Sequence, residues 1–230
     1  MIKMGRKGNH RHLAGLATPD FYNVHRKEFE YVTKSGAGRH TSEKSIPLIL
    51  AIKKAGLAST KRDAVRVLNE TTVLVNGRRI REMKYPVGLN DIIEFKDAGR
   101  SIAVGINANG QCTLDDTKTD RSNMHIKVIG KYKAAKGAIM LRLHDGSIIK
   151  GDNTTKVNDS VVITDDRTLK KTIPMKEGAK CLIINGVHLG SGGTLKKIKA
   201  GTMKIPATVI VQPENGEEFE TMIKNILVTG

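Results

Sequence analysis

The chain has 230 residues, a formal net charge of +16 and a sequence pI of about 9.9. So large an excess of Lys and Arg indicates a polyanionic partner, because side chains that neutralise phosphates release bound counterions. Aromatic residues make up only 3% and Trp is absent, which argues against reading of single strands by base stacking and favours recognition of folded RNA by backbone and shape.

The first 42 residues are predicted to form an extended basic arm. Residues 5–12 lack periodicity and apolar side chains, so they cannot fold alone. A short apolar patch follows at residues 13–22, and glycines interrupt the chain again at residues 35–40. Basic arms commonly become ordered only on RNA, and a terminus that is disordered in the free protein is compatible with this role. The candidate contact residues of the arm are Lys3, Arg6, Lys7, Arg11, His12, Arg26, Lys27 and Arg39.

A first helix is predicted to begin near Ser45, with Ser45 as the N-cap and Pro47 in the first turn. Apolar residues recur at helical spacing from Leu48 to Ala55. Gly56 then ends the pattern and is a candidate for the C-cap.

A second helix is predicted to begin at Thr60. Thr60 and Asp63 have the spacing of a capping box, with Asp in place of the usual Glu or Gln. Ala64, Val65 and Leu68 would then face inward.

A hairpin is predicted after this helix. Asn76 and Gly77 lie between apolar runs, and both central positions of a type I′ turn require positive φ. Residues 85–95 supply a turn and one more strand. Residues 43–97 are therefore expected to form a small helix–helix–hairpin module.

The second helix and the hairpin bring basic residues to adjoining edges of this module. Arg66 lies one helical turn beyond Arg62, so the two side chains can project together. An Arg guanidinium can hold a phosphate through two parallel hydrogen bonds, which the ammonium of Lys cannot. We predict an RNA-binding face here; the alternative is a solvated helix face beside an ordinary charged hairpin. The candidate residues are Lys61, Arg62, Arg66, Arg78, Arg79 and Arg81.

Residues 98–172 are predicted to form a central β-rich domain. The predicted strands are residues 125–130, 138–143 and 147–150. Asp145 and Gly146 form a hairpin turn between the last two. Residues 156–163 resemble residues 87–93, because an Asn-Asp turn leads into an apolar strand in both. We interpret this as one local solution used twice, not as a structural repeat.

Residues 173–230 are predicted to form a small barrel, because short strands separated by frequent turns are typical of barrels and sandwiches. The predicted strands are residues 178–184, 194–198, 209–211 and 219–223, with a turn at Asn215 and Gly216 before the last. The loop at residues 190–193 looks like a phosphate cradle, but it lacks the following helix of a dinucleotide fingerprint and the Gly-Lys-Ser/Thr of a P-loop. A barrel turn is the better reading, and the basic residues available to RNA beside it are Lys196, Lys197 and Lys199.

No catalytic residue, metal or cofactor is expected. Adjacent carboxylates at residues 115–116 and 165–166 point apart on a strand or turn, which disfavours acid–base catalysis. Cys112 and Cys181 cannot complete a zinc site; we expect free thiols in a reducing compartment, with Cys181 in a core strand. A metal site is also disfavoured for the histidines of the arm, which have no cysteine or carboxylate nearby. These histidines are His10, His12, His25 and His40.

No membrane segment is expected. The N-terminal residues 1–11 are polar and basic, unlike a signal peptide, and no apolar run is long enough to span a bilayer. The sequence therefore predicts a soluble, intracellular protein.

Three segments together resemble the S4e family of small-subunit ribosomal proteins from archaea and eukaryotes. Residues 46–95 resemble the helix–helix–hairpin RNA-binding module of the family, and residues 178–193 have the glycine spacing of its KOW motif. Residues 215–230 match the tail of the family. The sequence departs from the family at Tyr22, where members carry Trp, and at Arg39, where Pro precedes the histidine.

The resemblance implies an α+β, mostly β architecture that ends in an SH3-like KOW barrel. It implies a structural constituent of the small ribosomal subunit, in the cytoplasm, that binds and stabilises ribosomal RNA and contacts neighbouring small-subunit proteins. Neither a small-molecule substrate nor homo-oligomerisation is expected. With no basic extension after Gly230, the chain resembles the shorter archaeal form.

Two other functions would each account for part of the sequence. An RNA-modifying enzyme can use the helix–helix–hairpin module for docking, but it needs a catalytic domain, and residues 100–170 are too short and too rich in turns to form one. A transcription or translation factor with a KOW motif would account for the last sixty residues, but would leave the arm and the module without a role.

Overall fold

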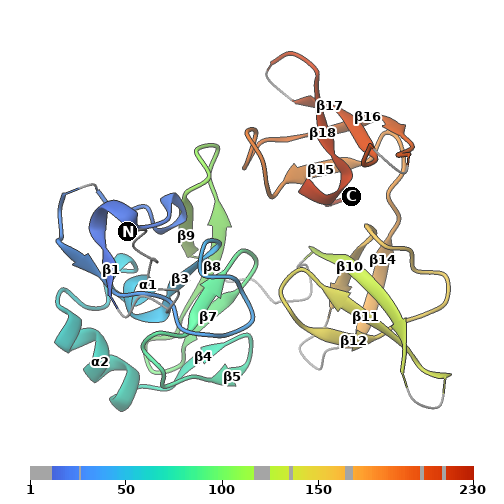
Figure 1. Ribbon diagram of the computed structural model, residues 1–230. Coiled ribbons are helices and arrows are strands. Elements are labelled where there is room, and N and C mark those ends of the chain that lie inside the picture. The colour runs from blue at the N-terminus through green and yellow to red at the C-terminus, as the bar shows by residue number, and fades with distance from the viewer. Residues whose placement is uncertain are drawn as a thin grey trace, which may run out of the picture.

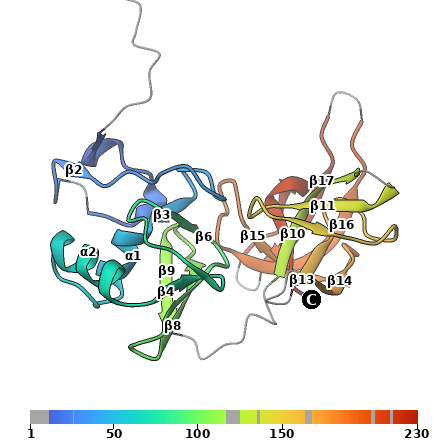
Figure 2. The ribbon, with the colours of Figure 1, turned by 90° about the horizontal axis from the view of Figure 1, so that it is seen from below.

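The computed structural model describes residues 12–25, 27–116, 125–134, 137–163, 168–202, 205–213 and 216–230. This part of the chain contains two α-helices and three five-stranded antiparallel sheets, each with its own hydrophobic core (Figures 1 and 2). We call the three resulting bodies the N-terminal, central and C-terminal units. The mostly β architecture that the sequence predicted is confirmed. Neither helix in the described part is long and apolar enough to cross a membrane.

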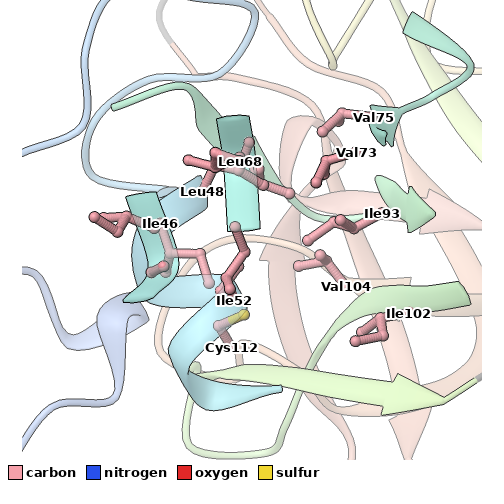
Figure 3. Packing of buried hydrophobic residues seen from close by; sticks show 14 of the residues in the cluster. Ile46, Leu48, Ile52, Leu68, Val73, Val75, Ile93, Ile102, Val104 and Cys112 are labelled. Atoms are coloured by element: carbon pink, nitrogen blue, oxygen red, sulfur yellow. The ribbon is translucent and has the colours of Figure 1, made fainter. Parts of the chain in front are cut away.

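The N-terminal unit is built on a sheet with the strand order β5-β4-β7-β8-β9. Its strands are β4 (Val73–Val75), β5 (Arg78–Arg79), β7 (Ile92–Phe95), β8 (Arg100–Ile106) and β9 (Cys112–Asp116). The helices α1 (Leu48–Lys54) and α2 (Lys61–Glu70) cover one face of the sheet. Figure 3 shows Ile52 of α1 and Leu68 of α2 beside Val73 and Ile93 of the sheet.

The N-terminal sheet extends beyond residue 97, where the sequence placed the end of the module. Strand β8 pairs with β7, and β9 pairs with β8. Ile102, Val104 and Cys112 from these two strands are buried in the same core as the helices. Because strand pairing and the core both cross residue 97, residues 98–116 are part of the N-terminal unit and not of the central one.

The start of the first helix differs from the prediction. Ser45–Pro47 forms strand β3, which pairs with β6 (Pro86–Gly88), and the helix begins only at Leu48. Ser45 does not cap the helix; its hydroxyl donates a hydrogen bond to the carbonyl of Thr41 at 2.8 Å. The residue before a proline is biased toward extended backbone, so Pro47 favours a strand before the helix.

The C-cap at Gly56 is confirmed. Gly56 has φ of +74°, and its N–H donates a hydrogen bond to the carbonyl of Lys53 at 3.0 Å. The N–H of Leu57 reaches the carbonyl of Ile52 at 3.3 Å. This pair of bonds is a Schellman motif, which requires the left-handed backbone that glycine adopts without strain.

The described part of the first 42 residues is folded, so the prediction of an extended arm is wrong for it. Its elements are β1 (Leu13–Ala14), η1 (Gly15–Ala17), η2 (Asp20–Tyr22) and β2 (Tyr31–Val32), with β1 paired to β2. Phe21 and Tyr22 are buried in the core of the N-terminal unit, and the Tyr22 hydroxyl lies 2.8 Å from the hydroxyl of Ser35. Two aromatic side chains are enough to anchor the segment on the module. Residues 1–11 and Arg26 lie outside the described residues.

The central unit is a sheet with the strand order β12-β11-β10-β13-β14. Its strands are β10 (His125–Lys133), β11 (Ile139–Leu143), β12 (Ile148–Lys150), β13 (Ser160–Ile163) and β14 (Leu169–Ile173). The predicted turn between β11 and β12 is confirmed, and Gly146 has φ of +78°. Strand β14 was not predicted.

The two Asn-Asp turns share one geometry. Asn90 and Asn158 both have positive φ, at +66° and +76°. The carboxylates of Asp91 and Asp159 each accept a hydrogen bond from the backbone N–H three residues earlier, at 2.9 Å and 2.8 Å. An Asn in the left-handed region followed by an Asp that bonds the local backbone closes such turns without glycine. The interpretation of one local solution used twice is confirmed.

The C-terminal unit is a sheet with the strand order β18-β17-β16-β15-β19. Its strands are β15 (Lys180–Ile183), β16 (Gly192–Lys199), β17 (Thr208–Pro213), β18 (Phe219–Met222) and β19 (Ile226–Val228), with η5 (Ile223–Asn225) before the last. The sequence predicted the first four strands. Asn215, half of the predicted final turn, lies outside the described residues.

The central and C-terminal units are joined by a buried ammonium group. Lys127 is only 2% exposed, and its Nζ donates hydrogen bonds to the carbonyls of Ile223 at 2.6 Å and Ile226 at 2.7 Å. Beside it, the hydroxyl of Ser160 accepts a hydrogen bond from the N–H of Val228 at 3.0 Å. Burial lowers the pKa of Lys127 to about 8.

The N-terminal unit contacts the central unit through polar side chains. Asn90 donates a hydrogen bond from Nδ2 to the carbonyl of His125 at 2.7 Å, and Arg39 forms an ion pair with Asp145. His40 is the next residue after Arg39, and its Nε2 lies 2.9 Å from a carboxylate oxygen of the buried Asp91. Burial alone would raise the pKa of Asp91, but the interaction with His40 holds it below its usual value.

The N-terminal unit also contacts the C-terminal unit directly. A Cβ on Gly190 would lie 2.0 Å from the carbonyl oxygen of Asn107, and one on Gly110 would lie 2.6 Å from the side chain of Leu189. The loop before β16 therefore sits against the tip of the β8–β9 hairpin (Figure 1). Each of the three units thus touches the other two.

We expect Lys127→Met to lower the free energy of unfolding by about 2 kcal/mol, because two buried carbonyl oxygens lose their donor. Lys131→Met is the matched control. Lys131 also donates to two backbone carbonyls, those of Asn153 at 2.6 Å and Thr155 at 3.0 Å, but within the central unit and nearer solvent. Its loss should cost less than about 1 kcal/mol. Urea denaturation followed by circular dichroism measures both, and equal losses would contradict the assignment.

The same variant tests the protonation of Lys127. The folded pKa of about 8 lies below the ordinary value of 10.5, so between these pH values the unfolded chain binds more protons than the folded one. The stability of the natural protein should therefore rise from pH 8 toward pH 10.5 relative to Lys127→Met. Parallel pH profiles of the two proteins would show that the buried amine titrates normally.

Candidate RNA interface

The start of α2 is fixed by a capping box, as the sequence predicted. The hydroxyl of Thr60 accepts a hydrogen bond from the N–H of Asp63 at 3.2 Å, and the Asp63 carboxylate accepts one from the N–H of Thr60 at 3.1 Å. Hydrogen bonds from Thr60 lower the pKa of Asp63. The capping box places Lys61 and Arg62 in the first turn of the helix, and both side chains are exposed.

Two cations in the first helical turn are electrostatically unfavourable. The N-terminal end of a helix carries a partial positive charge and unpaired N–H groups, which favour anions and repel Lys and Arg. Asp63 is the only acidic residue in this turn. Lys61, Arg62 and the end of the helix therefore concentrate positive potential at one place, where a phosphate would relieve the repulsion.

The hairpin contributes Arg78 to the same side of the sheet as α2. Arg78 pairs with Val75, which is buried under the helices, and residues paired across antiparallel strands share a face. Arg79 pairs instead with Leu74 and lies on the opposite face. Arg81 is exposed just beyond the end of β5. The structure thus separates two arginines that the sequence grouped together.

We define the basic face as Lys61, Arg62, Arg66 and Arg78. All four side chains are exposed. Arg66 lies 3.7 Å from the carboxylate of Glu70, in a pair that is 73% and 68% exposed. So exposed an ion pair contributes little, and a phosphate can replace its carboxylate. Within the described residues, Lys61, Arg62 and Arg78 form no ion pair.

The Lys and Arg residues predicted to contact RNA from the first 42 positions divide into three groups. Lys3, Arg6, Lys7, Arg11 and Arg26 lie outside the described residues. Lys27 is exposed, with φ of +66°. Arg39 has a side chain that is only 22% exposed and is occupied by its ion pair with Asp145. Its position indicates a contact between the N-terminal and central units.

The lysines of β16 lie among acidic partners. A bulge between Leu195 and Lys197 turns both Lys196 and Lys197 outward. Lys196 forms an ion pair with Glu218, and Lys199 forms one with Glu220 at 2.8 Å. The hydrogen bond from Lys199 lowers the pKa of Glu220. Lys197 has no ion pair among the described residues, so this sheet presents less free positive charge than the basic face.

Lys170 and Lys171 are basic residues that were not predicted as contact residues. Both are exposed on β14, and both line a cavity of about 420 Å³ between the central and C-terminal units. The adjacent pair was visible in the sequence. It was missed because the strand that carries it was not predicted, and because the cavity forms only when the two units meet.

Of the other groups considered for catalysis, both cysteines are buried and Asp116 is paired, while residues 165–166 lie outside the described residues. Burial raises the pKa of Cys112 to about 12 and that of Cys181 to about 11, so neither thiol forms a thiolate near neutral pH. Asp116 forms an ion pair with Arg100 at 2.8 Å. In the part of the chain that the structure describes, no three His, Cys, Asp or Glu side chains are grouped to hold a metal.

Comparison with known proteins identifies the modules. The S4 domain model matches residues 47–93, which run from the start of α1 through β7 and include the basic face. The model of Ribosomal family S4e matches residues 106–167, mostly in the central unit. Two family models thus match adjacent parts of the chain, in the order expected of one protein.

Relatives match along nearly the whole chain. Small ribosomal subunit protein eS4 of Methanosphaera stadtmanae is 30% identical over 230 residues, which cover 99% of this chain and 95% of that protein. The eS4 protein of Methanococcus aeolicus is 30% identical over 238 residues, covering 99% and 97%. Both matches therefore include the N-terminal, central and C-terminal units.

A solved structure agrees with these matches. The crystal structure of the 30S ribosomal protein S4e from Thermoplasma acidophilum superposes with a TM-score of 0.67 at 30% identity, over 80% of this chain and 94% of that one. The resemblance noted in the sequence is thus confirmed, and the chain belongs to the S4e family of small-subunit ribosomal proteins, which are structural proteins and not enzymes.

Proposed function

We propose that this protein is a structural constituent of the small ribosomal subunit, and that its basic face binds and stabilises ribosomal RNA. The observation that carries the proposal is the placement of Lys61, Arg62 and Arg78 on one side of the S4 module, exposed and not neutralised by a described carboxylate. Arg forks that hold phosphates bidentately, beside the N-terminal end of a helix, suit a structured RNA backbone.

Further contacts follow from the same reading. The basic residues that precede the folded module would bind along the RNA backbone. Arg79 and Arg81 would contact a second RNA strand on the other side of the hairpin. The C-terminal unit would be a KOW barrel that contacts RNA through Lys197. Lys196 and Lys199 would join this contact when RNA displaces their carboxylate partners. Neighbouring small-subunit proteins would cover other surfaces, with the protein present as one copy in a cytoplasmic ribosome.

The contacts between the units support tight binding. When several contact sites share one body, binding at the first raises the effective concentration of the others, and little entropy is lost in orienting them. Lys127 and the Arg39–Asp145 pair hold the units together before any RNA is bound. A chain of flexibly linked units would give up part of this advantage.

The function is tested by sedimentation of a native lysate through a sucrose gradient, with the particles then washed in high salt. We expect the protein to sediment with the small subunit at a fixed ratio and to remain after the wash, because a protein with many phosphate contacts is part of the particle. Recovery in the light fractions, or removal by moderate salt, would indicate a transient factor instead.

The basic face is tested by charge reversal in the full chain, measured as RNA affinity against salt concentration. Arg62→Glu and Arg78→Glu should each weaken binding and lower the slope of log K against log salt by about one, because each removes a phosphate contact. Lys96→Glu is the control, since Lys96 is exposed in the same module but is not one of the proposed contact residues. It should lower the slope by less than Arg62→Glu or Arg78→Glu; equal effects would show that binding follows net charge and not the basic face.

A further inference from the structure

One face of the central sheet is only partly covered by the C-terminal unit. Lys127, Ser160 and Ile173 form one row across β10, β13 and β14. Lys127 and Ser160 hydrogen-bond to the C-terminal unit, and Ile173 packs against its core. This row joins the two units, and Ile173 at its end also lines a cavity between them.

The neighbouring row on the same face remains open. His125 pairs with Val162, and Val162 pairs with Lys171, each two positions along its strand from the first row. Residues two apart on a strand share a face. The row forms the floor of the cavity of about 420 Å³, and Thr229 and Gly230 of the C-terminal unit close its side. This volume is within the range of pockets that enclose small ligands.

The lining of the cavity combines apolar walls with a cationic rim. Val162, Ile173 and Pro174 supply apolar surface, while Lys170 and Lys171 are exposed at the edge. No Asp or Glu side chain is among the described residues that line it. Lys170 and Lys171 place two positive charges at the rim, against the single main-chain carboxylate of Gly230, and this net positive charge favours an anionic ligand.

The pKa of His125 reflects this positive potential. Burial, and then the charge of Lys171, lower its pKa, and no carboxylate acts in the opposite direction. Its Nδ1 is buried and has no hydrogen-bond partner among the described residues. A ring held neutral beside a lysine adds a polar but uncharged wall, next to which a planar group can lie.

We propose that this cavity holds one unpaired nucleotide of the bound RNA, with its phosphate at Lys170 and Lys171 and its base against Val162 and Pro174. Unpaired bases are commonly recognised by apolar or planar surfaces with the backbone held by cations. An acidic protein segment would use the lysines but would leave the apolar walls without a ligand. The inference rests on the proposed function, and adds to it a site on a different unit from the basic face.

The test uses the full chain, with the four ribonucleoside monophosphates and inorganic phosphate as probes. The imidazole proton of His125 is followed by NMR through a pH titration at each ligand concentration. A bound phosphate should raise the pKa of His125, because the anion offsets the charge of Lys171. We expect the best mononucleotide to bind about tenfold more tightly than inorganic phosphate.

Lys171→Ala should weaken mononucleotide binding about tenfold, as expected for loss of a charge-assisted hydrogen bond. Lys150→Ala is the matched control, because Lys150 is also exposed, on β12 of the same unit, but does not line the cavity. It should bind mononucleotides as the natural protein does. Both lysines are on the surface, so both variants should fold.

Three results would overturn the proposal. They are no effect of any mononucleotide on His125, equal affinity for phosphate and mononucleotide, and tighter binding of a tetraglutamate peptide than of any mononucleotide. The last would indicate a protein partner. Failure here is distinct from failure of the proposed function, because Lys171→Ala should still sediment with the small subunit through its basic face.

Discussion

The arrangement of the three units depends on the ammonium group of Lys127, buried between two sheets. Burial of an unpaired charge is strongly unfavourable, so a lysine that is 2% exposed persists only where its donors are satisfied. The carbonyls of Ile223 and Ile226 satisfy them from the other unit. Separation of the units would leave these carbonyls without the hydrogen-bond donor that Lys127 supplies. The contact that requires desolvation of the ammonium group therefore also specifies how the two sheets meet.

The other contacts close the arrangement around this one. The N-terminal unit reaches the central unit through Asn90 and Arg39, and the C-terminal unit through the close approach of Gly190 to Asn107. Polar contacts and glycine packing join the units, together with Ile173, which packs against the core of the C-terminal unit. As a result the free cations of the S4 module and the lysines of β14 are held at a set separation.

What the sequence predicted correctly was local. The capping box of Thr60 and Asp63, the hairpin at Asn76 and the C-cap at Gly56 each depend on residues a few positions apart, whose backbone preferences are strong. The boundary errors depended on pairing between distant residues, to which Pro47 added a local preference for extended backbone. Ser45–Pro47 became a strand because it meets β6 about forty residues later, and the sheet crossed the expected boundary because β8 pairs with β7.

The site shows the same division. The sequence located the exposed basic residues of α2 and the hairpin, and the family match supports their role. It could not separate Arg78 from Arg79, because their faces follow from the register with β4. Nor could it show that Lys199 pairs with Glu220 on the neighbouring part of the sheet, or that Lys171 lines a cavity together with His125, more than forty positions earlier.

The central claim is that the units form one body before RNA binds, and single-molecule energy transfer measures this directly. Asn69→Cys on α2 and Val187→Cys, at a position 96% exposed in the C-terminal unit, provide labelling sites, while the native cysteines are buried and resist labelling. We expect one narrow distribution of transfer efficiency in the free protein, unchanged when ribosomal RNA is added. A broad distribution that narrows only with RNA would contradict the account, and would show that RNA, and not Lys127, sets the arrangement.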